Sequence, residues 1–200
     1  PAFIGDGSQL TNLPASTVNY SDIENAPFSY GTHEDIPGIQ AYSTTASGAK
    51  AFASGDRTKA TYSYTTAMGY KSEASNFAST ALGKETIASG QYATAMGQQT
   101  TASQDASTAM GDGSFASGNA ATAMGSFTEA IGIASTAMGQ QTKASGEYST
   151  AMGYTTTASD YNSLVVGRYN LLGSTVTNSN FQFSTENTAF VIGNGTANDS

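Results

Sequence analysis

The sequence predicts an all-β fold, a parallel β-solenoid or β-roll built from coils of fourteen residues. Eight glycines, from Gly69 to Gly167, recur every fourteen residues without a slip. All six methionines stand immediately before one of these glycines, where Leu82 and Val166 fill the other two places. Fourteen residues are too few for a helical hairpin, but they hold two short strands and two tight turns, which is one solenoid coil.

Composition limits the function classes. Of 200 residues, 38% are hydrophobic, 11% are charged and 22 are glycine, so a conventional core of large aliphatic residues is not available. The net charge of −8 argues against nucleic-acid binding, which needs clustered Lys and Arg. No run approaches the ~18 apolar residues of a membrane-spanning helix, and no signal peptide is visible, so we expect no membrane insertion. The absence of cysteine excludes disulfides and thiolate metal sites. The chain begins at Pro1, and we interpret it as a segment of a longer protein.

Other positions of the repeat are equally regular when each is counted from its glycine. Alanine stands nine before every glycine and two before seven of the eight, the last having Val165. Threonine stands three before from Thr66 to Thr150, and Ser or Thr always stands eleven before. With a degenerate copy ending at Gly55, nine coils are predicted over residues 42–167, stacked to a height of about 40 Å at the spacing of parallel strands.

Each coil is expected to hold two strands of four or five residues. We predict one turn at the position seven before the glycine, where Asn76, Gly90 and Gly118 are residues that tolerate positive φ. The repeated glycine itself is expected at the opposite corner.

The alternation of side chains along a strand sorts the columns by face. The two alanine columns are half a coil apart, so they are expected to face each other across a thin interior, with Ser and Thr beside them. Methionine and threonine then share an outward face that has no charge. The position ten before the glycine varies from Lys59 to Phe115, as is usual on a solvated face. An alternative is a wider roll in which Met and Thr point inward and the alanines outward.

An exposed methionine column of this length would be an apolar patch that soluble monomers rarely carry. The simplest cover is another copy of the same chain in a closed symmetric assembly. The residues predicted at this inter-chain interface are Met68, Leu82, Met96, Met110, Met124, Met138, Met152, Val166, Thr80, Thr94, Thr108, Thr122 and Thr136.

The phrases "STALGKETIASGQYATAMG" and "GDGSFASGNAATAMG" resemble the fourteen-residue head repeats of YadA-like trimeric autotransporter adhesins. The resemblance covers residues 42–167. It implies a left-handed parallel β-roll that associates as a homotrimer. Where the family often has Val and Ile, this chain has Thr and Met, so the inter-chain core is expected to be softer and more polar.

The flanks carry a second resemblance. "FIGDGSQLTNLP" at Phe3–Pro14, "NSLVVGRYN" and "TAFVIGNGT" are similar to segments of phage tail fibres and of large bacterial surface proteins, often upstream of a self-cleaving chaperone. We therefore expect an N-terminal connector over 1–41 and, over 168–200, an excursion that caps or extends the stack before continuing beyond the segment.

The sequence gives little support for an enzyme. His33 is the sole histidine and is read as part of a solvated loop with Glu34 and Asp35. The "GDGS" phrases at Gly5–Ser8 and Gly111–Ser114 are read as turns, because the calcium-loop patterns around them are incomplete. We expect no enzyme activity, cofactor or metal.

The predicted function is therefore a non-catalytic adhesin or fibre head that binds surfaces by multivalent display on a bacterial cell or virion, through a host-cell, matrix or glycan receptor that the sequence does not identify. A rigid spacer in a phage or injection-particle tail fibre is the main alternative. Ice binding is a further one, because the threonine column has a second Ser/Thr column beside it. Candidate ligand contacts are exposed aromatics: Tyr64, Tyr70, Phe77, Tyr92, Phe115, Phe127, Tyr148 and Tyr154.

Overall fold

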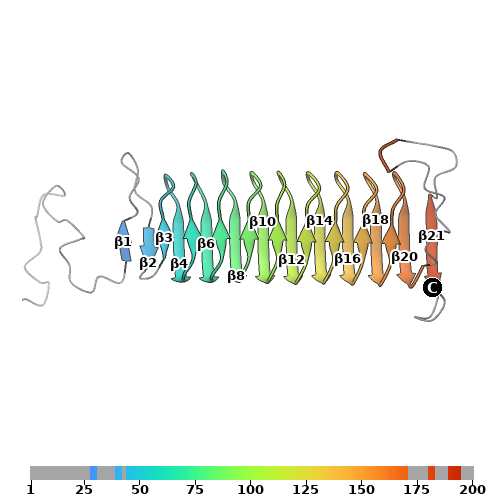
Figure 1. Cartoon of the computed structure of the whole chain (residues 1–200), viewed down its shortest axis with the longest axis horizontal. Coiled ribbons are helices and arrows are strands. Elements are labelled where there is room, and N and C mark those ends of the chain that lie inside the picture. Colours follow the sequence, from blue (N-terminus) through green and yellow to red (C-terminus); the bar gives the residue numbers. More distant parts are fainter. Residues whose placement is uncertain (1–27, 31–38, 42–43, 171–179, 183–188, 195–200) are drawn as a thin grey trace, which may run out of the picture.

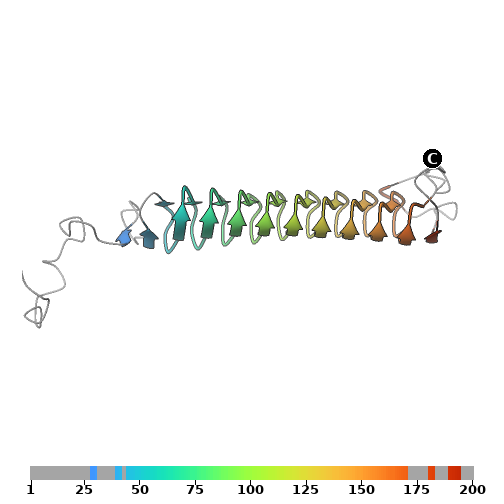
Figure 2. The ribbon, with the colours of Figure 1, turned by 90° about the horizontal axis from the view of Figure 1, so that it is seen from below.

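A computed structural model describes residues 28–30, 39–41, 44–170, 180–182 and 189–194, and in these residues the only regular elements are β-strands. Nine coils stack side by side into a straight solenoid (Figure 1). Each coil contributes one short and one long strand, and the two kinds form opposite layers of a thin slab (Figure 2). The all-β parallel solenoid predicted from the repeat is confirmed.

The long strands form sheet A, in which neighbouring coils pair in parallel without a register shift, so that Met96, for example, pairs with Met110. Their bounds are β4 (Phe52–Asp56), β6 (Thr66–Tyr70), β8 (Thr80–Lys84), β10 (Thr94–Gln98), β12 (Thr108–Asp112), β14 (Thr122–Ser126), β16 (Thr136–Gln140), β18 (Thr150–Tyr154) and β20 (Leu164–Arg168).

The short strands form sheet B and have only two residues each, where four or five were expected. Tight turns occupy the remaining residues of the coil on that side. The short strands are β3 (Thr45–Ala46), β5 (Lys59–Ala60), β7 (Glu73–Ala74), β9 (Ile87–Ala88), β11 (Thr101–Ala102), β13 (Phe115–Ala116), β15 (Glu129–Ala130), β17 (Lys143–Ala144) and β19 (Thr157–Ala158).

Sheet A continues beyond the nine coils at both ends. The strand β2 (Ile39–Ala41) pairs in parallel with β4, and β1 (Phe28–Tyr30) pairs antiparallel with β2. At the other end, β21 (Phe190–Asn194) adds to β20 so that Gly193 stands opposite Gly167. The displaced "FVIG" phrase therefore returns to the register of the repeat and extends sheet A.

The core is made almost entirely of alanine. Both alanine columns are fully buried, as Ala109 and Ala116 illustrate, and Val165 is the largest buried side chain. The Ser and Thr residues four and eleven before the glycine also point inward. The predicted interior is confirmed, and the wider roll with inward methionines is wrong for this chain, because two alanine layers leave no space for larger side chains between the sheets.

The repeated glycine, called the anchor glycine below, lies inside the long strand rather than at a corner. At Gly111, φ is +109°, and a Cβ atom would stand 2.0 Å from the carbonyl oxygen of Gly125 in the next coil. Glycine is thus required at this position for two reasons: the backbone has positive φ, and the neighbouring coil leaves no space for a Cβ atom.

The prediction that positive φ occurs seven residues before the anchor glycine is wrong. Positive φ falls five before the anchor glycine, on residues such as Tyr64 and Ala78, and again two after it, as at Lys71. Glycine is favoured seven residues before the anchor glycine for a different reason. A Cβ atom on Gly118 would lie 2.0 Å from the carbonyl oxygen of Gly132. We call the turns that precede the long strands the upper turns and those that follow them the lower turns, as they stand in Figure 1.

Candidate functional site

The outward face of sheet A carries the predicted interface residues. Threonine stands three before the anchor glycine and methionine one before it, both on the side opposite the buried alanine. Met68 is 42% exposed and Met96 is 37% exposed, while the other methionines, Leu82, Val166 and the threonines are half-buried by their neighbours in the column. From β4 to β20 these two positions hold no charged residue. We call this surface the Met/Thr face.

The Met/Thr face becomes more apolar toward its C-terminal end. Leu164 and Val166 replace threonine and methionine in β20, and Phe190 and Ile192 replace them in β21. Phe190 is 57% exposed and Ile192 is 69% exposed. Large apolar side chains on an outward face favour contact with another protein surface.

Only one of the two expected hydroxyl columns is on this face. The Ser and Thr residues four before the anchor glycine are buried in the interior, as are those eleven before it. The Met/Thr face therefore presents a single threonine column flanked by methionine, without the paired columns on which the ice-binding alternative was based.

The outward face of sheet B differs in chemistry. Its column contains two ion pairs between adjacent coils, Lys59 to Glu73 at 3.4 Å and Lys143 to Glu129 at 2.9 Å. Ile87 and Phe115 lie in the same column and are 42% and 39% exposed. Exposed ion pairs of this kind contribute little to stability, so the column has the character of a solvated surface.

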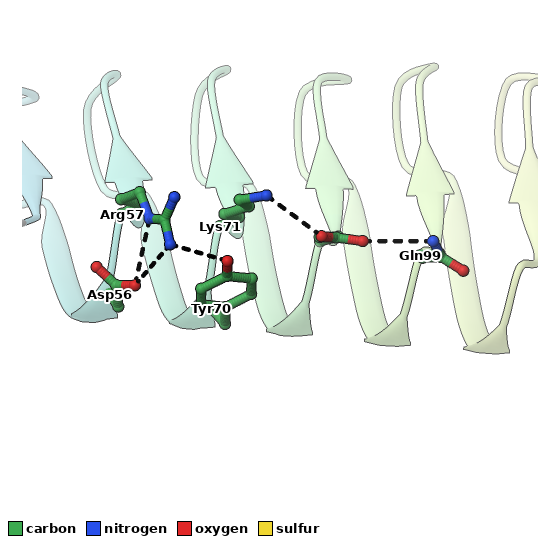
Figure 3. A network of polar contacts seen from close by, with 6 residues as sticks. Asp56, Arg57, Tyr70, Lys71 and Gln99 are labelled. Atoms are coloured by element: carbon green, nitrogen blue, oxygen red, sulfur yellow. Dashed lines mark hydrogen bonds and ion pairs between the residues drawn. The ribbon is translucent and has the colours of Figure 1, made fainter.

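The lower turns near the N-terminal end carry a polar network (Figure 3). The Arg57 guanidinium contacts Asp56 at 3.2 Å and donates a hydrogen bond to the Tyr70 hydroxyl at 2.8 Å. Lys71 pairs with Glu85 at 3.5 Å, and Gln99 donates to the same carboxylate at 3.3 Å. These contacts join side chains of successive coils along the edge, so charges here are mutually compensated.

A cluster of two tyrosines and an arginine lies at the lower turns near the C-terminal end of the solenoid. The rings of Tyr154 and Tyr169 meet edge to face with centroids 5.2 Å apart, and the Arg168 guanidinium lies over both. The hydrogen bond between the two hydroxyls raises the pKa of Tyr154 above its ordinary value. Tyr70 and Tyr154, two of the candidate ligand contacts, are thus half-buried members of local clusters.

The remaining aromatic candidates are displayed on the edges and on sheet B. Tyr64, Tyr92 and Tyr148 project from the upper turns and are 50%, 58% and 50% exposed. Phe127 projects from a lower turn over Gly113 and is 57% exposed, while Phe115 lies on sheet B.

Asn170 ends sheet B in a way that the sequence reading missed. It stands fourteen residues after Thr156, where a further coil would have Ser or Thr. Its side-chain oxygen accepts a hydrogen bond from the Thr157 backbone N–H at 2.7 Å, and its side-chain nitrogen donates to the Thr157 carbonyl at 2.9 Å. The amide group thereby takes the place of the next strand.

Among the residues that the structure describes, no group of three His, Asp or Glu side chains gathers that could hold a metal ion, and no helix is long and apolar enough to span a membrane. Of the second "GDGS" phrase, predicted to be a turn, Gly111 and Asp112 end the strand β12, and only Gly113 and Ser114 lie in the lower turn that follows. His33 and the first "GDGS" phrase lie outside the described residues.

Comparison with known proteins agrees with the repeat. The family described as the YadA head domain repeat matches residues 63–86, 88–114, 106–128, 116–142, 130–154 and 144–170, which together span more than half of the chain. The chain belongs to the YadA head domain repeat family. The resemblance noted from the fourteen-residue phrases is thereby confirmed, and it identifies an adhesin-type module. A search of curated proteins found no match.

Proposed function

We propose that this YadA head segment is a non-catalytic, homotrimeric head or shaft of an extracellular fibre, which attaches to surfaces by multivalent display. The observation that carries the proposal is the Met/Thr face, a continuous uncharged stripe with methionines up to 42% exposed in the single chain. Trimeric association is implied by the family, and closed symmetry brings identical stripes together.

Burial of the methionines between chains would add to the stability of the fold. The interior of a single coil is alanine, whose burial removes little apolar area from water. A fully buried methionine contributes about 1.5–3 kcal/mol by area. The symmetric interface thus adds an apolar layer that the alanine interior does not supply.

Display in three copies turns weak contacts into firm attachment, because the second and third contacts form at a high effective concentration. The adhesive role is tested with beads coated with the full chain and exposed under flow to cultured cells and matrix proteins. We expect beads with wild-type chain to be retained and beads with Met110→Asp/Met124→Asp to be released. Wild-type beads that are retained on no surface would instead support the spacer alternative.

A further inference from the structure

The upper turns of the second to fourth coils hold aromatic side chains in single file. The rings of Tyr64 and Phe77 meet with centroids 5.4 Å apart and an interplanar angle of 67°, and those of Phe77 and Tyr92 with 5.7 Å and 82°. Tyr62, two residues before Tyr64 in the same upper turn, is 51% exposed. We call Tyr62, Tyr64, Phe77 and Tyr92 the tyrosine ridge.

Two of these tyrosines occupy a backbone position that disfavours them. Tyr64 has φ of +62° and Tyr92 has φ of +56°, in the left-handed region that bulky residues rarely adopt. The same position holds alanine in four other coils, namely Ala78, Ala106, Ala120 and Ala134. The strained tyrosines do not fill the core either, because half or more of each side chain is exposed. Every coil has positive φ at this position, so the turn imposes the conformation whatever the side chain, and the exposed tyrosine rings are an addition that neither the turn nor the core needs.

The chemistry of the ridge favours an uncharged, hydroxyl-rich ligand. Between Lys50 and Asp105 the upper turns contain only uncharged side chains, with Ser63, Asn76 and Gln91 beside the rings. Tyrosine, serine and asparagine together are the residues that binding loops use for rigid contact area and adaptable hydrogen bonds. The single nearby cation, Lys50, lies over the Tyr64 ring with its Nζ 5.1 Å from the centroid, so it is already engaged.

The shape of the ridge favours a narrow linear ligand. Its rings follow the stacking axis of the coils, separated by about 5 Å per coil. A stable protein partner needs a patch of about 800 Å² on each side, broader than one file of side chains. A polysaccharide chain is one sugar wide and can bind along a single row of side chains.

We propose that the tyrosine ridge binds a neutral linear polysaccharide along the axis of the solenoid. The C–H faces of sugar rings pack on the rings of Tyr64 and Tyr92, between which the Phe77 ring stands edge to face, and the negative ring faces attract the slightly positive hydrogens. The sugar hydroxyls exchange hydrogen bonds with the tyrosine hydroxyls and with Gln91, whereas the Asn76 side chain is engaged by a backbone carbonyl and a backbone N–H. This inference rests on the proposed adhesive function and assigns its receptor class.

The test uses the full chain and the double variant Tyr64→Ala/Tyr92→Ala. Alanine is native at this position in neighbouring coils, so the coil conformation is retained. The matched control is Phe127→Gln, which removes an equally exposed ring from a lower turn where Gln99 and Gln141 occur naturally. Binding is measured by biolayer interferometry to immobilised amylose, mannan, cellulose oligomers and chitin oligomers, with heparin as the charged comparison.

We expect wild type and Phe127→Gln to bind at least one neutral polysaccharide equally, with little change between low and high salt, because no charges take part. The double variant should bind it at least about tenfold more weakly, as loss of two interface tyrosines usually causes. Binding to no neutral polysaccharide, binding to heparin alone with steep salt dependence, or equal binding by the double variant would each overturn the ridge proposal.

The two proposals fail separately. If the double variant keeps both its oligomeric mass and its bead retention on cells, the adhesive function stands and the ridge is not its receptor site. If wild-type beads are retained on no surface, the adhesive function fails whatever the polysaccharide assay shows. A change of mass in the double variant would place the ridge in a contact between protomers and would overturn the polysaccharide site.

Discussion

Sheet A and sheet B are formed by the same nine coils, yet their outward faces are built differently. Sheet A pairs five residues per coil and repeats threonine and methionine with hardly a change, whereas sheet B pairs two and varies from Lys59 to Phe115. A surface in contact only with water can vary in this way, but a surface that must fit copies of itself cannot. The difference supports the proposal that identical chains meet at sheet A while sheet B faces solvent.

We expect the largest effect from substitution of an anchor glycine in sheet A. Gly111→Ala places a Cβ atom 2.0 Å from a backbone oxygen at a φ of +109°, so the stack must open in its centre. We expect loss of cooperative unfolding, measured by circular dichroism during a thermal scan. Gly118→Ala, beside sheet B, brings a Cβ atom equally close to the Gly132 carbonyl oxygen but needs no positive φ, and other coils accommodate the side chains of Gln104 and Asp160 at this position, so we expect its cost to be smaller. Equal effects of the two changes would remove the distinction between the sheets.

The Met/Thr face is tested by charge. Met110→Asp/Met124→Asp puts carboxylates into the proposed interface, where an unpaired buried charge costs several kcal/mol in each chain. We expect the trimer to dissociate to a marginally stable chain, as measured by light scattering. The control Ile87→Asp/Phe115→Asp adds the same charge to sheet B and should leave the mass unchanged. Dissociation by the control, or none by the methionine variant, would contradict the assignment of faces.

The end of sheet B is tested at Asn170. Asn170→Ala removes both hydrogen bonds to the Thr157 backbone, each contributing about 0.5–1.5 kcal/mol. We expect faster hydrogen exchange at Thr157 while the amides of β20 in sheet A stay protected. Exchange rates that rise equally in both sheets would show that Asn170 supports the whole end of the stack and does not only cap sheet B.

We expect the smallest difference between the two sheets from the hydroxyl groups buried in the interior. Thr100, on the sheet B side, buries an Oγ1 with no hydrogen-bond partner, whereas Ser107, on the sheet A side, donates to the Gln104 carbonyl. We therefore expect Thr100→Val to raise the free energy of unfolding by about 1 kcal/mol and Ser107→Ala to lower it by a similar amount. Urea denaturation measures both, and a destabilised Thr100→Val would mean that its hydroxyl has a partner such as a buried water.

The sequence predicts most of this fold because every coil repeats the same physical constraint. The alanine columns, the outward methionines and the number of coils follow from period and parity alone. Conformations in the turns do not, because an alanine such as Ala78 can adopt positive φ when hydrogen bonds to adjacent coils hold it there, as its N–H bonds to the Ser63 carbonyl. Asn170 was missed because a side chain that replaces a strand leaves no periodic pattern.

The candidate sites are only partly predictable. Exposure of Tyr64, Tyr92 and Phe127 is expected from their turn positions, and it is found. The engagement of Tyr70 by Arg57, and of Tyr154 by Tyr169, depends on contacts between residues thirteen to fifteen apart, which become visible only when the coils are stacked.

The most direct test of the central claim, that the Met/Thr face is an interface between identical chains, is the mass of the full wild-type chain by sedimentation equilibrium over a range of concentrations. We predict a single species of three times the 20.4 kDa chain mass. A stable, folded species of 20.4 kDa at all concentrations would contradict the claim.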